Sequence, residues 1–329
     1  GILQAALQVP PMWRRGFRVP RAPGPDETVF RVLRLTIPAA LGMAITQVNV
    51  VVDRLLATLI AAWAPAALYY SERLIYLPLG IIATALSTVL LPAYSHQVAR
   101  AEEQDIRHTL VLSMRTMLFL MIPAAVGLGV LARPIIEMIY QWRAFTPESS
   151  WLTARALRFY ALGLVVFGLN KALVPAFYAR QDTRTPVRLG MRVVGLNIAL
   201  NVFFVLTLPL YYKHAGLALG TVLAETAYLL MLSRRLSRQL GGIDWGVLRR
   251  SALRITTAAA GMALLIPVIQ DWLRSLVLRL EITGKPAQLA YTLGLVVGGG
   301  TLYLLLAFLL RMPELAVLRR AWFSPRAGR

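Results

Sequence analysis

The chain has 329 residues, of which 57% are hydrophobic and only 15% are charged, and its mean hydropathy is +0.62. Soluble domains are closer to half apolar and a quarter charged, so this composition excludes an ordinary soluble globular protein. It predicts an all-α polytopic membrane protein, and the absence of cysteine excludes disulfides and cysteine-based metal sites.

The net charge of +20 comes from 35 Lys and Arg against 15 Asp and Glu. In a soluble protein this excess would suggest a nucleic-acid partner. In a membrane protein, basic loops fix the topology and contact anionic lipid headgroups. We therefore predict anionic lipids as partners and no nucleic acid.

The first 35 residues hold an apolar stretch of nine residues, GILQAALQV, which ends at Pro10-Pro11 and is followed by an arginine-rich loop. Nine residues are too few to cross a bilayer. We interpret the stretch as the end of a helix whose beginning lies outside this sequence. Region 1–35 is then the end of a truncated helix plus a basic cytoplasmic loop, and the chain is expected to be a fragment of a longer protein.

Apolar runs of about 20 residues predict about eight transmembrane helices in the rest of the chain. A basic linker over 233–250 and a basic tail over 311–329 are expected in the cytoplasm. The eight predicted spans cover residues 36–62, 67–94, 109–131, 156–178, 187–208, 215–232, 251–270 and 287–310.

The charge of the loops predicts the orientation of these spans. Alternate loops, beginning with 10–35 and ending with 311–329, carry roughly three times as many Lys and Arg as the remaining loops. Because positive loops stay in the cytoplasm, we expect a multi-pass protein of the bacterial cytoplasmic (inner) membrane with a cytoplasmic C-terminus.

Glu72 and Arg73 lie near one end of the second predicted span, which also contains Pro78 and Pro92. Arg73 predicts a substrate-binding contact for an anion, with Glu72 tuning it, because the planar guanidinium binds phosphate through two parallel hydrogen bonds. A structural ion pair at the outer interface is the alternative. The two prolines are candidate gating positions because each removes a backbone donor from the helix.

Asp53 lies in the first span beside Arg54, and Asn197 and Asn201 share one face of the fifth span at i, i+4. Together with Thr221 in the sixth span they form a candidate coupling-cation site, since a hard cation such as Na⁺ prefers oxygen ligands. Asp53 alone could instead carry a proton, and polar contacts between helices are an equal alternative. No other metal site, cofactor, nucleotide loop or nucleophile–base pair is predicted, so an enzyme is not expected.

The segment Tyr69–Ser95, YYSERLIYLPLGIIATALSTVLLPAYS, resembles a segment of the bacterial lipid II flippase family (MurJ, formerly MviN). Residues Pro175–Pro186, PAFYARQDTRTP, are similar to a second segment of that family, and His214–Leu219 and Gly1–Pro11 are similar to two more. The resemblance covers nearly the whole chain, and its two longer motifs are specific.

The resemblance implies a transporter of fourteen helices in two lobes plus a last pair, within the superfamily of multidrug, oligosaccharidyl-lipid and polysaccharide exporters. This chain would supply the second six-helix lobe at 36–232 and a C-terminal helix pair at 251–310 that forms a lipid-tail groove. The family's cavity arginine falls on Arg73 and its acidic neighbour on Glu72. Some members carry an acidic residue where this chain has Tyr76.

The implied function is movement of lipid II (undecaprenyl-pyrophosphate carrying a disaccharide-peptide) from the inner to the outer leaflet by alternating access. A Na⁺ or proton gradient or the membrane potential would supply the energy, and cell-wall synthesis proteins are candidate partners. Two alternatives stay open. One is a cation-coupled multidrug or oligosaccharide-lipid exporter of the same superfamily, and the other is a non-transporting scaffold for cell-wall synthesis.

Overall fold

The computed structural model describes residues 9–13, 30, 47, 49–281 and 283–316. The chain divides into two units, Gly1–Ile45 and Thr46–Arg329. In the first unit only residues 9–13 and 30 are described, and all are helical. Most of the expected basic loop at 10–35, the beginning of the first predicted span and most of the basic tail at 311–329 lie outside the described residues.

The second unit is built from helices, and the described residues contain no strand. A helix over residues 49–60 precedes the named elements. These are α3 (Ala64–Pro78), η1 (Leu79–Ala83), α4 (Thr84–Ala99), α5 (Glu103–Val130), α6 (Ala132–Tyr140), α7 (Pro147–Ala179), α8 (Arg184–Thr207), α9 (Leu210–Gln239), α10 (Trp245–Arg279) and α11 (Gly284–Leu309).

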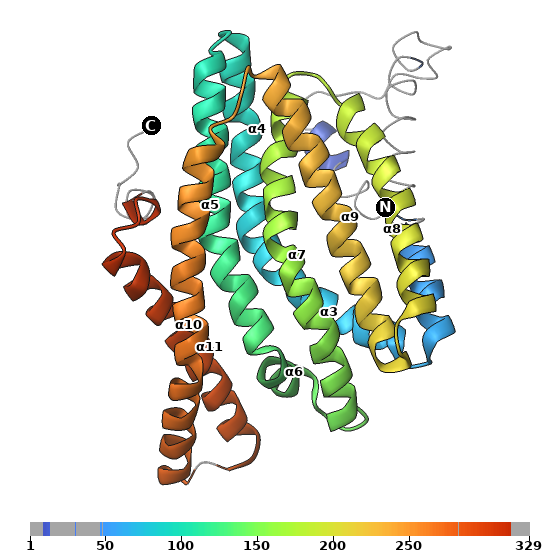
Figure 1. Cartoon of the computed structure of the whole chain (residues 1–329), viewed down its shortest axis with the longest axis vertical. Helices are drawn as coiled ribbons and strands as arrows, with labels where there is room; N and C mark the ends of the chain where they lie inside the picture. Colours follow the sequence, from blue (N-terminus) through green and yellow to red (C-terminus); the bar gives the residue numbers. More distant parts are fainter. Residues whose placement is uncertain (1–8, 14–29, 31–46, 48, 282, 317–329) are drawn as a thin grey trace. The chain divides into compact units, whose positions relative to one another are not determined.

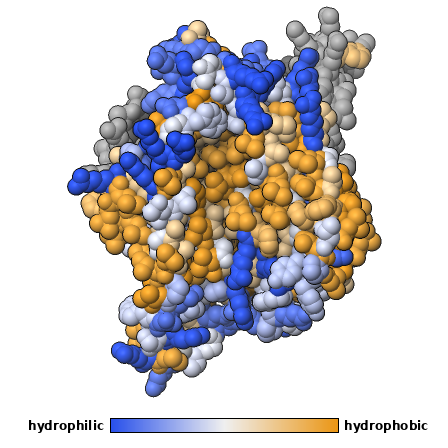
Figure 2. Space-filling model, viewed as in Figure 1, coloured by the Kyte–Doolittle hydropathy of each residue, from blue (hydrophilic) through white to orange (hydrophobic). Residues whose placement is uncertain are grey.

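Seven helices among the described residues are long and apolar enough to cross a membrane. They correspond to the second to eighth predicted spans, and the all-α membrane fold is confirmed. Most helices extend beyond the predicted ends because an apolar run marks only the part of a helix that lies in lipid. In Figure 2 an apolar belt crosses the middle of this unit, with hydrophilic residues at both ends.

Helix α7 lies at the centre of the second unit and packs against α3, α4, α5 and α9. Its N-terminus is capped by Thr146, whose Oγ1 accepts a hydrogen bond from the Ser149 amide at 3.2 Å. Helices α10 and α11 pack on each other, and α10 also packs on α5. A buried hydrogen bond from the Tyr303 hydroxyl to the Phe119 carbonyl, 2.8 Å long, holds α11 against α5.

Two sequence-based predictions about loops are wrong. Residues 132–140 were expected in a link, but they form the short helix α6, which places Ile135 and Ile136 in the core. Residues 209–214 lie between the predicted spans 187–208 and 215–232 and were expected in a link, but α9 begins at Leu210 and buries His214. Its Nε2 lies 2.9 Å from the Leu152 carbonyl, which gives the buried imidazole a partner.

Candidate functional site

The Glu72 carboxylate pairs with Arg54 rather than with its neighbour Arg73. Arg54 Nη2 lies 2.9 Å from Glu72 Oε2, and Arg54 Nη1 also donates to the Pro65 carbonyl at 3.1 Å. The Tyr76 hydroxyl donates to the other oxygen, Oε1, at 2.9 Å. Glu72 therefore joins the helix over 49–60 to α3, and both of its carboxylate oxygens are occupied.

Arg73 has an exposed side chain, and none of the ion pairs between described residues includes it. Its guanidinium carbon lies 4.8 Å from the centre of the Tyr69 ring, one helical turn away, and this cation–π contact leaves the N–H donors free of carboxylates. The arrangement keeps a permanently charged, planar donor set on a membrane-spanning helix.

The four predicted cation-site residues lie together. Asn201 Nδ2 donates to Asp53 Oδ1 at 2.7 Å and to Asn197 Oδ1 at 2.9 Å. Asn197 Nδ2 lies 3.3 Å from Thr221 Oγ1. If the Asn197 amide is turned over, its nitrogen instead reaches Asp53 Oδ1 at 3.1 Å and Asn49 Oδ1 at 3.0 Å. In both orientations one polar network joins α8 and α9 to the helix over 49–60.

The donor set of this network suits a hard cation. It brings carboxylate, amide and hydroxyl oxygens together inside an apolar bundle, and the buried Oδ1 of Asn201 has no hydrogen-bond partner among the described residues. An unsatisfied buried oxygen needs an explanation such as an ion or water. Gly220 permits the arrangement, because a Cβ there would lie 2.2 Å from Asn201 Oδ1.

A second polar pair, which the sequence analysis did not identify, lies between α7 and α9. Asn170 Nδ2 donates to Glu225 Oε2 at 2.7 Å and to the Glu225 carbonyl at 3.3 Å. A lone acidic residue within an apolar span was the signal that could have revealed it. Lys171, next to Asn170 on α7, has an exposed side chain.

The two prolines differ in their surroundings. Pro78 ends α3, and the π-helical turn η1 follows immediately, with the Thr84 amide donating to the Leu79 carbonyl. The two halves of this long helix point in different directions (Figure 1). Pro92 lies inside α4, which continues to Ala99. A π-turn next to a proline is a common cause of a helix bend.

The described chain is a bundle of membrane-spanning helices with an oxygen-lined polar network between them and an exposed arginine, Arg73, on one helix, which is the architecture of a polytopic membrane protein. Within the described residues, no group of three or more His, Cys, Asp or Glu side chains could hold a metal. Residues 1–282 match the family model described as "Lipid II flippase MurJ". The chain therefore belongs to the MurJ lipid II flippase family.

Individual relatives agree with this family. A probable lipid II flippase MurJ of Vibrio cholerae is 35% identical over 73% of this chain and 45% of its own length. The corresponding Rhizobium meliloti protein is 34% identical over 98% of this chain and 60% of its own length. The chain thus spans about half the length of the curated relatives that it matches.

Two solved structures share the fold. A lipid II flippase MurJ in an inward closed conformation matches with a TM-score of 0.68 and 25% identity, over 92% of this chain and 57% of that chain. An outward-facing multidrug resistance transporter of the MATE family, in the MOP superfamily, matches with a TM-score of 0.53 and 17% identity, over 84% of this chain and 64% of that chain. At that identity the second likeness concerns the fold alone.

Proposed function

We propose that the protein takes part in moving lipid II from the inner to the outer leaflet of the bacterial inner membrane by alternating access. The observation that carries this proposal is Arg73, a cation on a membrane-spanning helix of a MurJ-family chain, with no carboxylate partner among the described residues. Its donors match a pyrophosphate. The names of the relatives describe transport, and we assign no enzymatic reaction.

The test replaces the flippase of a host cell with this protein, expressed from its own gene, and measures lipid II in the outer leaflet. We expect wild type to restore it, Arg73→Ala to abolish the restoration, and Arg73→Lys to restore it only in part because a lysine lacks the bidentate fork. Arg274→Ala, at an exposed arginine of α10, is the matched control.

Three other results would redirect the proposal. Restoration by every variant would remove Arg73 from the site. Failure of correctly inserted wild type, together with export of small cationic drugs, would favour the exporter. Function that stays intact when the charges of both Arg73 and Asp53 are removed would favour the scaffold for cell-wall synthesis proteins.

The network of Asp53, Asn197, Asn201 and Thr221 is the proposed site of a coupling cation, with Na⁺ as the candidate. We expect Gly220→Ala to displace Asn201 by the close contact described above and to abolish Na⁺-dependent thermal stabilisation of the purified protein. Gly190→Ala on α8, where an added Cβ meets nothing within 4 Å, is the control. If the Asp53→Asn variant still transports with the same dependence on the ion gradient as wild type, the site is excluded.

The lipid tail is proposed to lie against the C-terminal helix pair. An almost wholly apolar pocket of about 550 Å³ lies between α5, α7 and α10, where Met114, Leu118 and Leu169 face Leu248 and Ala252. Leu264 and Phe308 add apolar surface, being 77% and 71% exposed on α10 and α11. Leu118→Gln should weaken binding of an undecaprenyl carrier, and Leu264→Gln is the comparison outside the pocket.

Anionic phospholipid is proposed to bind a groove between α8 and α9. This groove of about 360 Å³ is lined by five arginines, Arg188, Arg192, Arg234, Arg235 and Arg238, none of which forms an ion pair with a described carboxylate. Basic pockets between membrane helices hold lipid phosphates.

The groove is tested by lipid binding to the purified protein. The double variant Arg188→Gln/Arg192→Gln should lose the phosphatidylglycerol that wild type retains in native mass spectrometry. Arg250→Gln/Arg254→Gln, a matched exposed i, i+4 pair on α10, should keep it. Equal retention by both double variants would exclude the groove as a specific site.

A further inference from the structure

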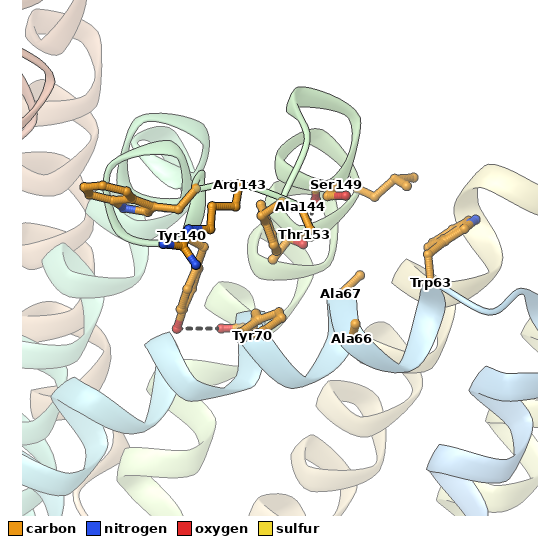
Figure 3. Close-up of a pocket in the computed structure, with 12 residues that line it drawn as sticks. Trp63, Ala66, Ala67, Tyr70, Tyr140, Arg143, Ala144, Ser149 and Thr153 are labelled. Atoms are coloured by element: carbon orange, nitrogen blue, oxygen red, sulfur yellow. Dashed lines mark hydrogen bonds between the residues drawn. The ribbon is translucent and has the colours of Figure 1, made fainter. Parts of the chain in front are cut away.

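A cavity of about 470 Å³ lies near the Arg73 turn of α3, and five of its twelve lining residues are aromatic (Figure 3). Its volume is in the usual range of small-molecule sites, roughly 300–1,000 Å³. Three segments build it, namely the first turns of α3, the link from α6 to α7 and the first turns of α7. The lining residues are Trp63, Ala66, Ala67, Tyr70, Tyr140, Trp142, Arg143, Ala144, Phe145, Ser149, Leu152 and Thr153.

The aromatic rings pack on one another around this cavity. The Tyr70 and Tyr140 ring centres are 4.7 Å apart, and Phe145 meets Tyr70 edge-on at 5.5 Å. Trp142 also lines the cavity but is 60% exposed, and Trp151 outside the cavity is 43% exposed, as residues of a membrane-interface belt are. Tyr70, Tyr140 and Phe145 are partly buried, and these three rings form the aromatic wall of the cavity.

Polar groups complete the wall at one side of the cavity. Arg143 and the hydroxyl side chains of Ser149 and Thr153 line it together. Arg143 adopts φ of +45°, in the left-handed region that costs a non-glycine residue about 1–2 kcal/mol. The same conformation occurs at four other turns that follow helices, so it does not by itself mark a site. None of the ion pairs between described residues uses the Arg143 guanidinium.

Helix α11 holds this link in place. Lys285 Nζ donates to the Gln141 carbonyl at 2.8 Å and the Glu137 carbonyl at 3.3 Å, and it lies 4.8 Å from the centre of the Trp142 ring. The cavity wall is thus fixed before any ligand arrives, which lowers the entropy cost of binding.

The cavity adjoins the proposed pyrophosphate contact. Tyr70 precedes Arg73 by three residues, so the two lie on neighbouring positions of one helical face, about one turn apart. The Tyr69 ring, over which the Arg73 guanidinium lies, packs edge-on against Tyr70 of the cavity wall, with the two ring centres 5.5 Å apart. A ligand with a phosphate at Arg73 would therefore extend its next group toward these rings.

We propose that this aromatic cavity, lined by Tyr70, Tyr140 and Arg143, binds a sugar ring of the transported lipid, next to the pyrophosphate that Arg73 holds. The inference rests on the proposed function. A pyranose ring has an apolar C–H face that stacks on aromatic rings and hydroxyls that hydrogen-bond to guanidinium and Ser or Thr groups. An aromatic wall with a few converging polar groups provides both kinds of contact.

The test compares two ligands that share one carrier, undecaprenyl pyrophosphate with and without its disaccharide, each binding to the protein in lipid nanodiscs. We expect wild type to bind the sugar-bearing form about tenfold more tightly, the effect of a stacked ring plus a hydrogen bond. Tyr140→Ala and Arg143→Asn should remove most of this difference and leave the affinity for the sugar-free carrier within about twofold of wild type.

Arg143→Asn is the sharper of the two variants, because asparagine tolerates positive φ and keeps the loop conformation while the guanidinium is lost. Trp151→Ala removes an aromatic side chain from the first turns of α7 but outside the cavity. This variant should keep the full difference in affinity between the two ligands. Arg73→Ala should weaken both ligands equally, which separates the pyrophosphate contact from the sugar contact.

Equal wild-type affinity for the two ligands would overturn the sugar site and leave the proposed transport intact. If Tyr140→Ala also lost affinity for the sugar-free carrier, the sugar site would be overturned as well, since the cavity would then hold the lipid chain. If neither ligand binds to folded wild type, the proposed function fails and the sugar site with it.

Discussion

The contact between Arg54 and Glu72 shows how one ion pair at the residue scale determines which charge remains free. Both side chains are about one-third exposed, at 33% and 30%. Removal of one partner leaves a lone charge in an apolar bundle, so it destabilises the fold more than removal of both partners does. We expect Arg54→Gln and Glu72→Gln each to lower the melting temperature in detergent more than the double variant does. Additive losses, with coupling below roughly 0.5 kcal/mol, would show that the pair contributes nothing.

The polar sites differ in how far the sequence predicted them. Asn197 and Asn201 could be placed on one face by their spacing alone, and an acidic residue in another span suggested their companion, Asp53. The partner of Glu72 could not be found in this way, since Arg54 is 18 residues away and the separation reflects the turn between two helices. The Asn170–Glu225 pair, 55 residues apart, also depends on packing that no local pattern records.

At the scale of elements, the π-helical turn after Pro78 is the feature best suited to bending. Proline leaves the carbonyl one turn earlier without its helical partner, and the following residues adopt the wider π-helical pattern. We expect Pro78→Ala to raise thermal stability, because a regular helix regains that hydrogen bond, and to slow transport. Pro92→Ala, inside a regular helix, is the comparison. A Pro78→Ala variant that transports at the wild-type rate would exclude gating at this turn.

A buried carboxylate fastens the segment after α11 to two other helices. Glu314, only 4% exposed, accepts hydrogen bonds from Ser251 at 2.6 Å and from Arg115 Nε at 2.9 Å. Burial acts to raise the pKa of Glu314, but the hydrogen bonds from Ser251 and Arg115 and the charge of Arg115 outweigh it and hold that pKa below its usual range.

A depressed carboxylate pKa gives a definite pH dependence. The folded state is stabilised at pH values above the unfolded pKa, about 4.3 for glutamate, and that stability is lost as the pH falls through the lower folded value. We expect Glu314→Gln to lower the free energy of unfolding by about 2 kcal/mol at pH 7 and by less near pH 4. Glu281→Gln, at an exposed carboxylate, should change neither. A constant deficit across this range would contradict the assigned role.

Helix positions were predicted far better than helix ends. The apolar runs of the second to eighth predicted spans each coincide with a long helix. Helix α9, however, begins at Leu210 and ends at Gln239, beyond the predicted 215–232 on both sides. Polar and charged residues in the end turns lie outside the lipid, so they do not interrupt a helix even though they end an apolar run. The short helix α6 escaped prediction because nine residues are too few for a spanning run.

The loop charges predict the orientation of the membrane-spanning helices, and this prediction can be tested directly because the chain has no cysteine of its own. Single cysteines at exposed Glu148 and Glu281 lie at one end of the helices, and those at exposed Arg100 and Gln239 lie at the other. We expect a membrane-impermeant maleimide to label Glu148→Cys and Glu281→Cys in intact spheroplasts. Arg100→Cys and Gln239→Cys should react only after permeabilisation, because basic loops remain in the cytoplasm.

The pattern of labelling also determines on which side of the membrane the aromatic cavity lies. The aromatic cavity lies at the same end as Glu148, so the predicted pattern places the sugar contact on the outer side, where a flipped headgroup emerges. The reverse pattern would put the C-terminus outside and the cavity at the loading side, contrary to the loop charges. Labelling of Glu148→Cys without Glu281→Cys would instead contradict the alternating crossings of α7 to α10, because four crossings must return the chain to the side on which it started.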